Sequence, residues 1–327
     1  MTAINNGDLH ILGATIKLGE RKEVNFNVAN LHSSTPVNVP IIIERAKKPG
    51  PTVLFTAGIH GDEVNGVEIV RQLIAKGINK PKCGTVICMP VINIFGFINL
   101  KREFPDGRDL NRVFPGSPTG SLAGRVAYKL INDVIPNVDF IIDFHTGGSG
   151  RFNAPQLRFE KSNEALIALA KVFGAPFVLY SKNLPKSFRA TCSKLGKPIL
   201  LFEGGKSFHI DDAVTNSGVN GSKRILKHLG MLSSTIKSSK PRHDCVFIDD
   251  SKWLRAKYSG MFKETIHIGA YVLQGAILGH ITDPYGKFDY AVKAPNSGYI
   301  INVNEAPIVY QGDALFHISK KLKRVLN

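Results

Sequence analysis

The chain has few cysteines for its 327 residues: Cys83, Cys88, Cys192 and Cys245. No two of them have Cys-x-x-Cys spacing, and a chain of this length can bury a full core without disulfide bonds. The sequence therefore argues against a small, disulfide-stabilised fold. We expect reduced, mostly buried thiols in a cytoplasmic protein.

Long apolar runs are also missing. No run approaches the ~20 residues that a membrane-spanning helix needs. The first residues, "MTAINNGDLHIL", lack the basic segment followed by an apolar one that marks a secretory signal. We therefore expect a cytoplasmic location and no membrane partner.

Acidic residues are scarce beside basic ones, 26 against 42, which gives a formal net charge of +16. Nucleic-acid binding is one explanation for such an excess. However, the Lys and Arg residues are scattered, and no RNA-binding signature or recognition-helix pattern is present. We expect no nucleic-acid partner, and a basic surface that either attracts a small acidic substrate or serves only solubility. A homo-oligomer is left open.

Short apolar runs rich in β-branched residues alternate with helical patterns over residues 1–232. The runs that read as buried strands are "VPIIIERA", "TVLFTAG", "TVICMPVIN", "VDFIIDFH", "FVLY" and "PILLFEGG". Between two of them, residues 63–77 place apolar side chains on one helical face, with Gly77 suited to the C-terminal cap. This alternation predicts an α/β sheet with helices on both faces.

The sequence changes character near Ser233. Residues 233–243 are rich in serine and lysine and are expected to form a linker. In residues 244–327 the spacing V-x-x-G-x-x-L-x-x-I occurs twice, each time after a Ser-Gly pair. Two such units predict a small C-terminal all-β domain, a sandwich or barrel. The pattern resembles biotinyl/lipoyl-type domains, but Lys287 lacks the Met-Lys or Asp-Lys context of a carrier lysine.

Side chains suited to metal binding follow the predicted strands. His60 and Glu63 come after "TVLFTAG", and His145 ends "VDFIIDFH". Ligands of an open α/β sheet lie outside the carboxyl ends of its strands, so we expect these side chains to converge. Two histidines and a carboxylate form the three-ligand set of hydrolytic zinc, so we expect one Zn²⁺ per chain. Taken singly, the His-x-x-Glu pair would be a helix cap and His145 a core residue.

Glu203 ends the strand "PILLFE" at the same predicted edge. A glutamate near a zinc-bound water can take its proton and pass it to a leaving amine, so Glu203 is the candidate general base. The alternative is an ion pair with Lys206 at a helix start.

The segment 93–116 has no strong periodicity and is rich in basic side chains. Arginine grips a carboxylate through two parallel hydrogen bonds, so such a loop suits a substrate with free carboxylates. Asp109 is placed to accept the second ring N–H of His60. The alternative is a solvated basic loop. The candidate substrate-contacting residues are Arg102, Arg108, Asn111 and Arg112.

The motifs "GIHGDEVNG", "GRDLNRVFPG", "DFHTGG" and "FEGG", in this order, resemble the succinylglutamate desuccinylase/aspartoacylase family, itself similar to zinc carboxypeptidases. The resemblance covers nearly the whole chain and implies a zinc-carboxypeptidase-like mixed sheet. It implies zinc on His60, Glu63 and His145, water activation by Glu203, carboxylate binding by Asn111 and Arg112, and an oxyanion contact from Arg102, with Arg108 as the alternative. Arg151, Asn153 and Arg158 follow the second histidine, where side chains can line the pocket.

These observations predict a zinc-dependent amide hydrolase that removes the acyl group from an N-acyl amino acid or a similar small, carboxylate-bearing substrate. One alternative is a metallocarboxypeptidase that acts on a short peptide. The other is a non-catalytic relative that binds a ligand without turnover. The presence of Glu203 beside the three metal-binding candidates argues against the second alternative, because a binding protein needs no base.

Overall fold

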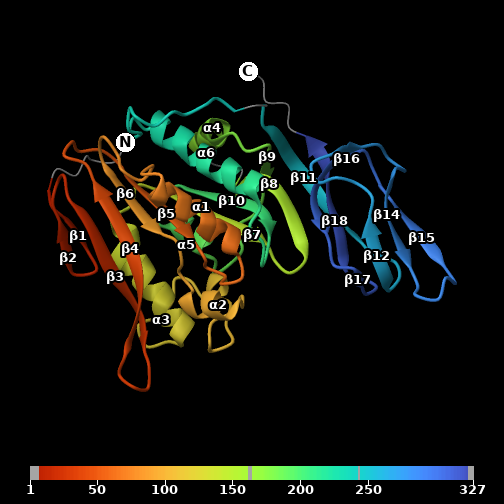
Figure 1. Ribbon diagram of the computed structural model, residues 1–327, viewed down its shortest axis with the longest axis horizontal. Helices are drawn as coiled ribbons and strands as arrows, with labels where there is room; N and C mark the ends of the chain where they lie inside the picture. Colours follow the sequence, from red (N-terminus) through yellow and green to blue (C-terminus); the bar gives the residue numbers. More distant parts are fainter. Residues whose placement is uncertain (1–6, 161–163, 242–243, 323–327) are drawn as a thin grey trace.

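The computed structural model describes residues 7–160, 164–241 and 244–322. The strands are β1 (Leu9–Ile11), β2 (Ala14–Ile16), β3 (Arg21–Asn30), β4 (Pro36–Arg45), β5 (Thr52–Ala57), β6 (Thr85–Met89), β7 (Phe140–Gly147), β8 (Arg151–Phe159), β9 (Phe177–Tyr180), β10 (Ile199–Lys206), β11 (Val246–Arg255), β12 (Gly260–Glu264), β13 (Tyr271–Val272), β14 (Ile277–Thr282), β15 (Asp289–Lys293), β16 (Gly298–Asn304), β17 (Ile308–Val309) and β18 (Ala314–Leu322). One large mixed sheet runs through the molecule in the order β13-β16-β18-β11-β9-β8-β10-β7-β5-β6-β4-β3 (Figure 1). A smaller sheet has the order β15-β14-β12-β17.

Helices cover both faces of the part of the large sheet that lies within residues 7–232. The α-helices are α1 (Val64–Ala75), α2 (Ile94–Asn99), α3 (Leu122–Lys129), α4 (Glu164–Phe173), α5 (Phe188–Lys194) and α6 (Asp212–His228), with short turns η1 (Leu110–Arg112), η2 (Leu130–Val134) and η3 (Ile135–Asn137). One core joins buried side chains of α1, α4 and α6 to the sheet, and a second core on the other face contains those of α3 and α5. The predicted mixed α/β fold with helices on both faces is confirmed.

The centre of the sheet brings several strand ends to one edge. β5 pairs in parallel with β6 and β7, and β7 pairs in parallel with β10. All eight residues of β7 are buried, as expected for a strand that is covered on both faces. The carboxyl ends of β5, β7 and β10 therefore open at the same edge.

The C-terminal strands form a two-layered β unit around its own core (Figure 1). The two V-x-x-G-x-x-L-x-x-I repeats occupy equivalent places in it, and their glycines, Gly275 and Gly312, both have positive φ, +86° and +94°. The Oγ atoms of Ser259 and Ser297 each accept a hydrogen bond from the turn of the other repeat, both at 2.9 Å. The two repeats are therefore joined by reciprocal hydrogen bonds.

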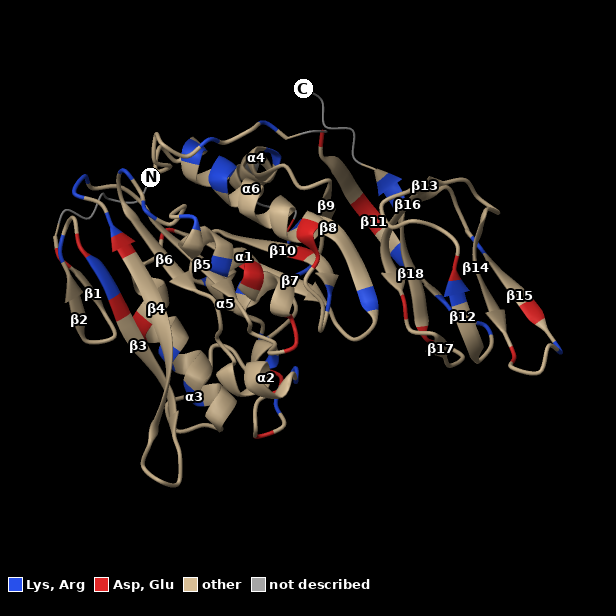
Figure 2. Cartoon of the chain, in the orientation of Figure 1, with Lys and Arg blue, Asp and Glu red and all other residues tan. Residues whose placement is uncertain are grey.

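The β unit shares the large sheet with the α/β part. β11 pairs in parallel with β9, and β16 pairs antiparallel with the first residues of β8. The division into domains at 232 and 244 stays a prediction, and residues 242–243 of the expected linker lie outside the described residues. Among the described residues, no helix is both long and apolar enough to cross a membrane. Lys and Arg residues occur along the chain from the N-terminal strands to the β unit (Figure 2).

Candidate active site

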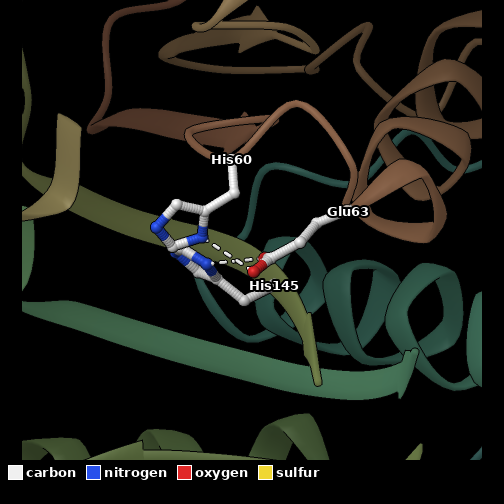
Figure 3. Close-up of side chains that lie close together, drawn as sticks. All are labelled: His60, Glu63 and His145. Atoms are coloured by element: carbon white, nitrogen blue, oxygen red, sulfur yellow. Dashed lines mark hydrogen bonds and ion pairs between the residues drawn. The ribbon is translucent and has the colours of Figure 1, made fainter. Parts of the chain in front are cut away.

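The turn after β5 brings His60 and Glu63 to His145 at the end of β7 (Figure 3). Glu63 Oε1 lies 2.7 Å from His60 Nδ1, and Glu63 Oε2 lies 2.9 Å from His145 Nδ1. Glu63 occupies the N-cap position of α1, yet its side chain makes no cap hydrogen bond. Its carboxylate instead faces the two rings and accepts a hydrogen bond from the backbone N–H of Thr146 at 3.0 Å. The capping alternative is therefore wrong for this side chain.

A carboxylate lies behind each histidine. His60 Nε2 lies 3.1 Å from Asp109 Oδ1, so the predicted contact is observed. His145 Nε2 lies 2.8 Å from Asp143 Oδ2. The sequence reasoning missed Asp143, although residues two apart on a strand point to the same face. Each outer carboxylate can accept the Nε2–H of its ring, and in that neutral tautomer Nδ1 is the nitrogen available to a metal ion.

The three side chains of the cluster are buried, and their charges interact strongly with one another. Burial alone would lower the pKa of His60 and of His145, but the surrounding carboxylates outweigh it and raise the pKa of both rings, that of His145 well above its usual value. Burial would likewise raise the pKa of Glu63, yet the two histidines hold it well below its usual range. Three polar groups concentrated out of water in this way are typical of a functional site.

The donor set fits a divalent metal ion. One ligand atom from each of His60, Glu63 and His145 lies within 4.8 Å of the other two. Two imidazole nitrogens and one carboxylate oxygen, without a thiolate, are the protein ligands typical of a catalytic zinc site rather than of a closed structural one.

The loop before η1 brings Arg102 to this cluster. Its guanidinium lies 2.9 Å from Asp109 Oδ2 and 3.3 Å from Glu63 Oε1. Asn93 holds the loop in place, because its side-chain nitrogen donates to the carbonyls of Arg102 and Glu103, both at 3.2 Å. Arg108 is exposed and does not line the cavity at the cluster. Of the two candidate arginines, the structure therefore places Arg102 beside the His60–Glu63–His145 cluster.

Asn111 and Arg112 line the same cavity. The side-chain oxygen of Asn111 accepts the backbone N–H of Phe188 at 2.8 Å, and this bond leaves the side-chain nitrogen available to donate to a substrate. One guanidinium nitrogen of Arg112 donates to the carbonyl of Asn111 at 2.7 Å, and the residue is exposed. Both side chains suit an anionic group.

Glu203 ends the regular part of β10 and faces this cavity. Asn153 donates to its Oε2 at 2.8 Å, and Arg158 Nη1 lies 3.7 Å from its Oε1. The alternative partner, Lys206, still belongs to β10 and forms an ion pair with Glu305 at 2.7 Å. The alternative reading, a pairing of Glu203 with Lys206 at a helix start, is therefore wrong.

A model of the succinylglutamate desuccinylase/aspartoacylase catalytic domain matches residues 49–229, a span that includes all four motifs. The chain belongs to this family. The N-alpha-acetyl-L-2,4-diaminobutyric acid deacetylase of Halomonas elongata is 27% identical over 259 residues, 76% of this chain and 75% of that relative. The resemblance recognised in the sequence is confirmed.

Solved structures of desuccinylase/aspartoacylase-like proteins share the fold. The product-bound ectoine utilization protein EutE (DoeB) from Ruegeria pomeroyi superimposes with a TM-score of 0.82 at 22% identity, covering 97% of this chain and 100% of that one. The succinylglutamate desuccinylase/aspartoacylase from Rhodobacter sphaeroides gives 0.79 at 24% identity, covering 94% and 96%. At these identities the likeness establishes the fold.

The cavity of this desuccinylase/aspartoacylase family member has a volume of about 760 Å³, and several Arg and Lys side chains line it. Arg189, 9% exposed, donates to Ser181 Oγ at 3.0 Å and to the carbonyl of Lys182 at 2.9 Å. Burial, together with the neighbouring charge of Arg158, lowers its pKa to about 10. An anion between these two arginines would offset their repulsion. The lining residues that the sequence reasoning missed include Lys182, Arg189, Trp253 and Asn302.

Proposed function

We propose that this family member is a zinc-dependent deacylase with a zinc-carboxypeptidase-like arrangement of its site. It hydrolyses the amide bond of an N-acyl amino acid or a similar small, carboxylate-bearing amide. The observation that carries the proposal is the His60–Glu63–His145 cluster, which opens into the same cavity as Glu203. The similarity to the Halomonas elongata relative, a deacetylase of an acetylated amino acid, supports the reaction class.

In this proposal His60 and His145 bind zinc through Nδ1, and Glu63 binds it through a carboxylate oxygen. When bound, the ion supplies Lewis-acid polarisation of the amide carbonyl and of the attacking water. Asp109 and Asp143 keep the two rings oriented, because each accepts the N–H on the far side of its ring.

Glu203 acts as the general base and then as the general acid. Its carboxylate takes a proton from the water as the water oxygen bonds to the carbonyl carbon. It then gives that proton to the nitrogen as the C–N bond breaks, so that a carboxylic acid and an amine are formed. Arg102 adds positive charge where the carbonyl oxygen becomes negative. No step uses Arg108, which is exposed.

The substrate carboxylate is bound by Asn111 and Arg112. Arg158 and Arg189 add positive charge to another wall of the same cavity, which favours an acidic substrate over a neutral one. The general basicity of the chain, with a net charge of +16, acts in the same direction.

A hydrolysis screen tests this function. Zinc-loaded protein is assayed on N-acetyl and N-succinyl amino acids beside short peptides, and the assay is repeated after chelation and after zinc is restored. We expect hydrolysis of N-acyl amino acids that disappears with the metal and returns with it. Turnover of peptides alone would favour a carboxypeptidase, and tight binding without turnover would favour a non-catalytic relative.

A further inference from the structure

We propose that Asn302, in the C-terminal β unit, is a positioning residue for Glu203 and acts through Asn153. The inference rests on the proposed role of Glu203 as the base. It gives the β unit a direct part in the chemistry.

The three side chains form a chain of hydrogen bonds. Asn302 Nδ2 donates to Asn153 Oδ1 at 2.7 Å, and Asn153 Nδ2 donates to Glu203 Oε2 at 2.8 Å. The carboxylate end fixes the direction, because a carboxylate can only accept. Asn153 must therefore turn its nitrogen to Glu203 and its oxygen to Asn302, which in turn must supply a donor.

The backbone holds this chain of bonds in register. Asn153 lies opposite Gly205 of β10 on one side and opposite Asn302 of β16 on the other. The ladder between β10 and β8 is irregular between Glu203 and Gly205. Strand pairing is therefore interrupted after Glu203 and resumes at Gly205, and side-chain contacts help to fix the position of the Glu203 carboxylate.

The burial of Asn302 indicates that its amide is kept for this contact. The residue is 2% exposed, and its side-chain oxygen has no hydrogen-bond partner among the described residues. A buried acceptor without a partner is destabilising, so an apolar side chain of similar size would serve the core at least as well. The nitrogen, which reaches Asn153, is the half of the amide with a partner.

The test is the kinetics of Asn302→Leu in the zinc-loaded, full-length protein. We expect kcat to fall about 10- to 100-fold, the usual effect of a misplaced catalytic group, with KM changed less than threefold (~0.6 kcal/mol at RT ≈ 0.59 kcal/mol) and with normal zinc content. The same change in an Asn153→Leu background should add almost nothing, because the contact to Glu203 is already lost. The isosteric Asn302→Asp, which cannot donate when ionised, should be slow as well at a pH where the introduced carboxylate is ionised.

Asn304 provides a matched control on the same strand. It is 9% exposed, and its side-chain amide bonds, among the described residues, to two groups of the β unit: it donates to Ala314 O at 3.1 Å and accepts from Ala306 N at 3.0 Å. Asn304→Leu should lower thermal stability and leave kcat close to that of the wild type. Asn304→Leu removes two hydrogen bonds and should therefore destabilise the fold more than Asn302→Leu does. Slow turnover in Asn302→Leu but not in Asn304→Leu would then separate positioning from general destabilisation.

Three results would overturn the inference: wild-type kcat in Asn302→Leu, wild-type kcat in Asn302→Asp, or multiplicative losses in the Asn153/Asn302 double variant. Glu203→Gln distinguishes this failure from failure of the proposed function. If Glu203→Gln is inactive while both Asn302 variants turn over normally, only the positioning role is lost. If Glu203→Gln is itself active, the proposed mechanism is wrong.

Discussion

Arg108 and Arg112 are four positions apart in the sequence, but of the two only Arg112 lines the cavity. Arg112→Ala should reduce kcat/KM for a carboxylate-bearing substrate far more than for its neutral amide analogue. A hydrogen bond to a charged group contributes about 1.5–3 kcal/mol, or roughly a factor of 10 to 150. Arg108→Ala, the matched control, should leave both rates unchanged. Equal losses on the two substrates would make Arg112 a structural residue.

His317 stacks on Trp253, the only tryptophan, with ring centroids 4.5 Å apart and planes 6° from parallel. Burial, with help from the charge of Arg158, lowers the pKa of His317 to about 3. The contribution of neutral His317 to the free energy of unfolding is therefore fully present above the unfolded-state pKa near ~6.5. It is lost progressively as the pH falls toward the folded-state pKa of about 3.

His317→Phe keeps the ring stack and removes this titration. Between pH 6.5 and 5, its free energy of unfolding should fall less steeply than that of the wild type, by up to ~1.4 kcal/mol per pH unit. Denaturant unfolding followed by Trp253 fluorescence measures the difference. Parallel stability curves for the two proteins would show that His317 titrates normally in the folded state.

Residues at strand ends could be predicted, whereas residues that reach the site from a distance could not. His60, Glu63, His145 and Glu203 were found because each follows an apolar strand and the topology brings such ends together. Asn302 contacts Asn153 across 149 positions, and no local pattern marks that pairing.

At the scale of the element, the turn between β5 and α1 depends on close backbone packing. A Cβ atom at Gly61 would overlap the backbone of Gly96 in α2. Gly61→Ala should therefore displace this turn, lower the free energy of unfolding by more than ~3 kcal/mol and reduce zinc content. Gly107 has positive φ (+73°) but open space around it, so Gly107→Ala should cost only ~1–2 kcal/mol and keep the metal. Similar stabilities for the two variants would contradict this account of the turn.

The central strands and α1 were predictable from the sequence, whereas α2 to α6 were not placed by residue range. All six apolar runs form strands, and α1 ends just before Gly77, which has φ +63° as expected for a C-terminal cap. β3, β8 and the joining of β11 to β9 were not foreseen. β8 reads ambiguously because its sequence "RFNAPQLRF" mixes cavity-lining charges with core residues and contains a proline.

At the scale of the whole molecule, the large sheet joins the β unit to the α/β part. All α-helices of the described residues lie between 64 and 228, whereas Trp253 lies in β11. Helix loss by far-UV circular dichroism and Trp253 fluorescence should therefore follow one common denaturation curve. Two separate transitions would show that residues 244–322 unfold independently, as a domain in their own right.

The central claim is that a metal held by His60, Glu63 and His145 works with Glu203 as the base. The most direct test measures zinc content and turnover of Glu203→Gln in the same preparation. The amide keeps the size of the side chain but cannot accept the proton, so we expect normal zinc content with turnover reduced by ~10²–10⁴-fold. Normal zinc content with near-normal turnover would contradict the account.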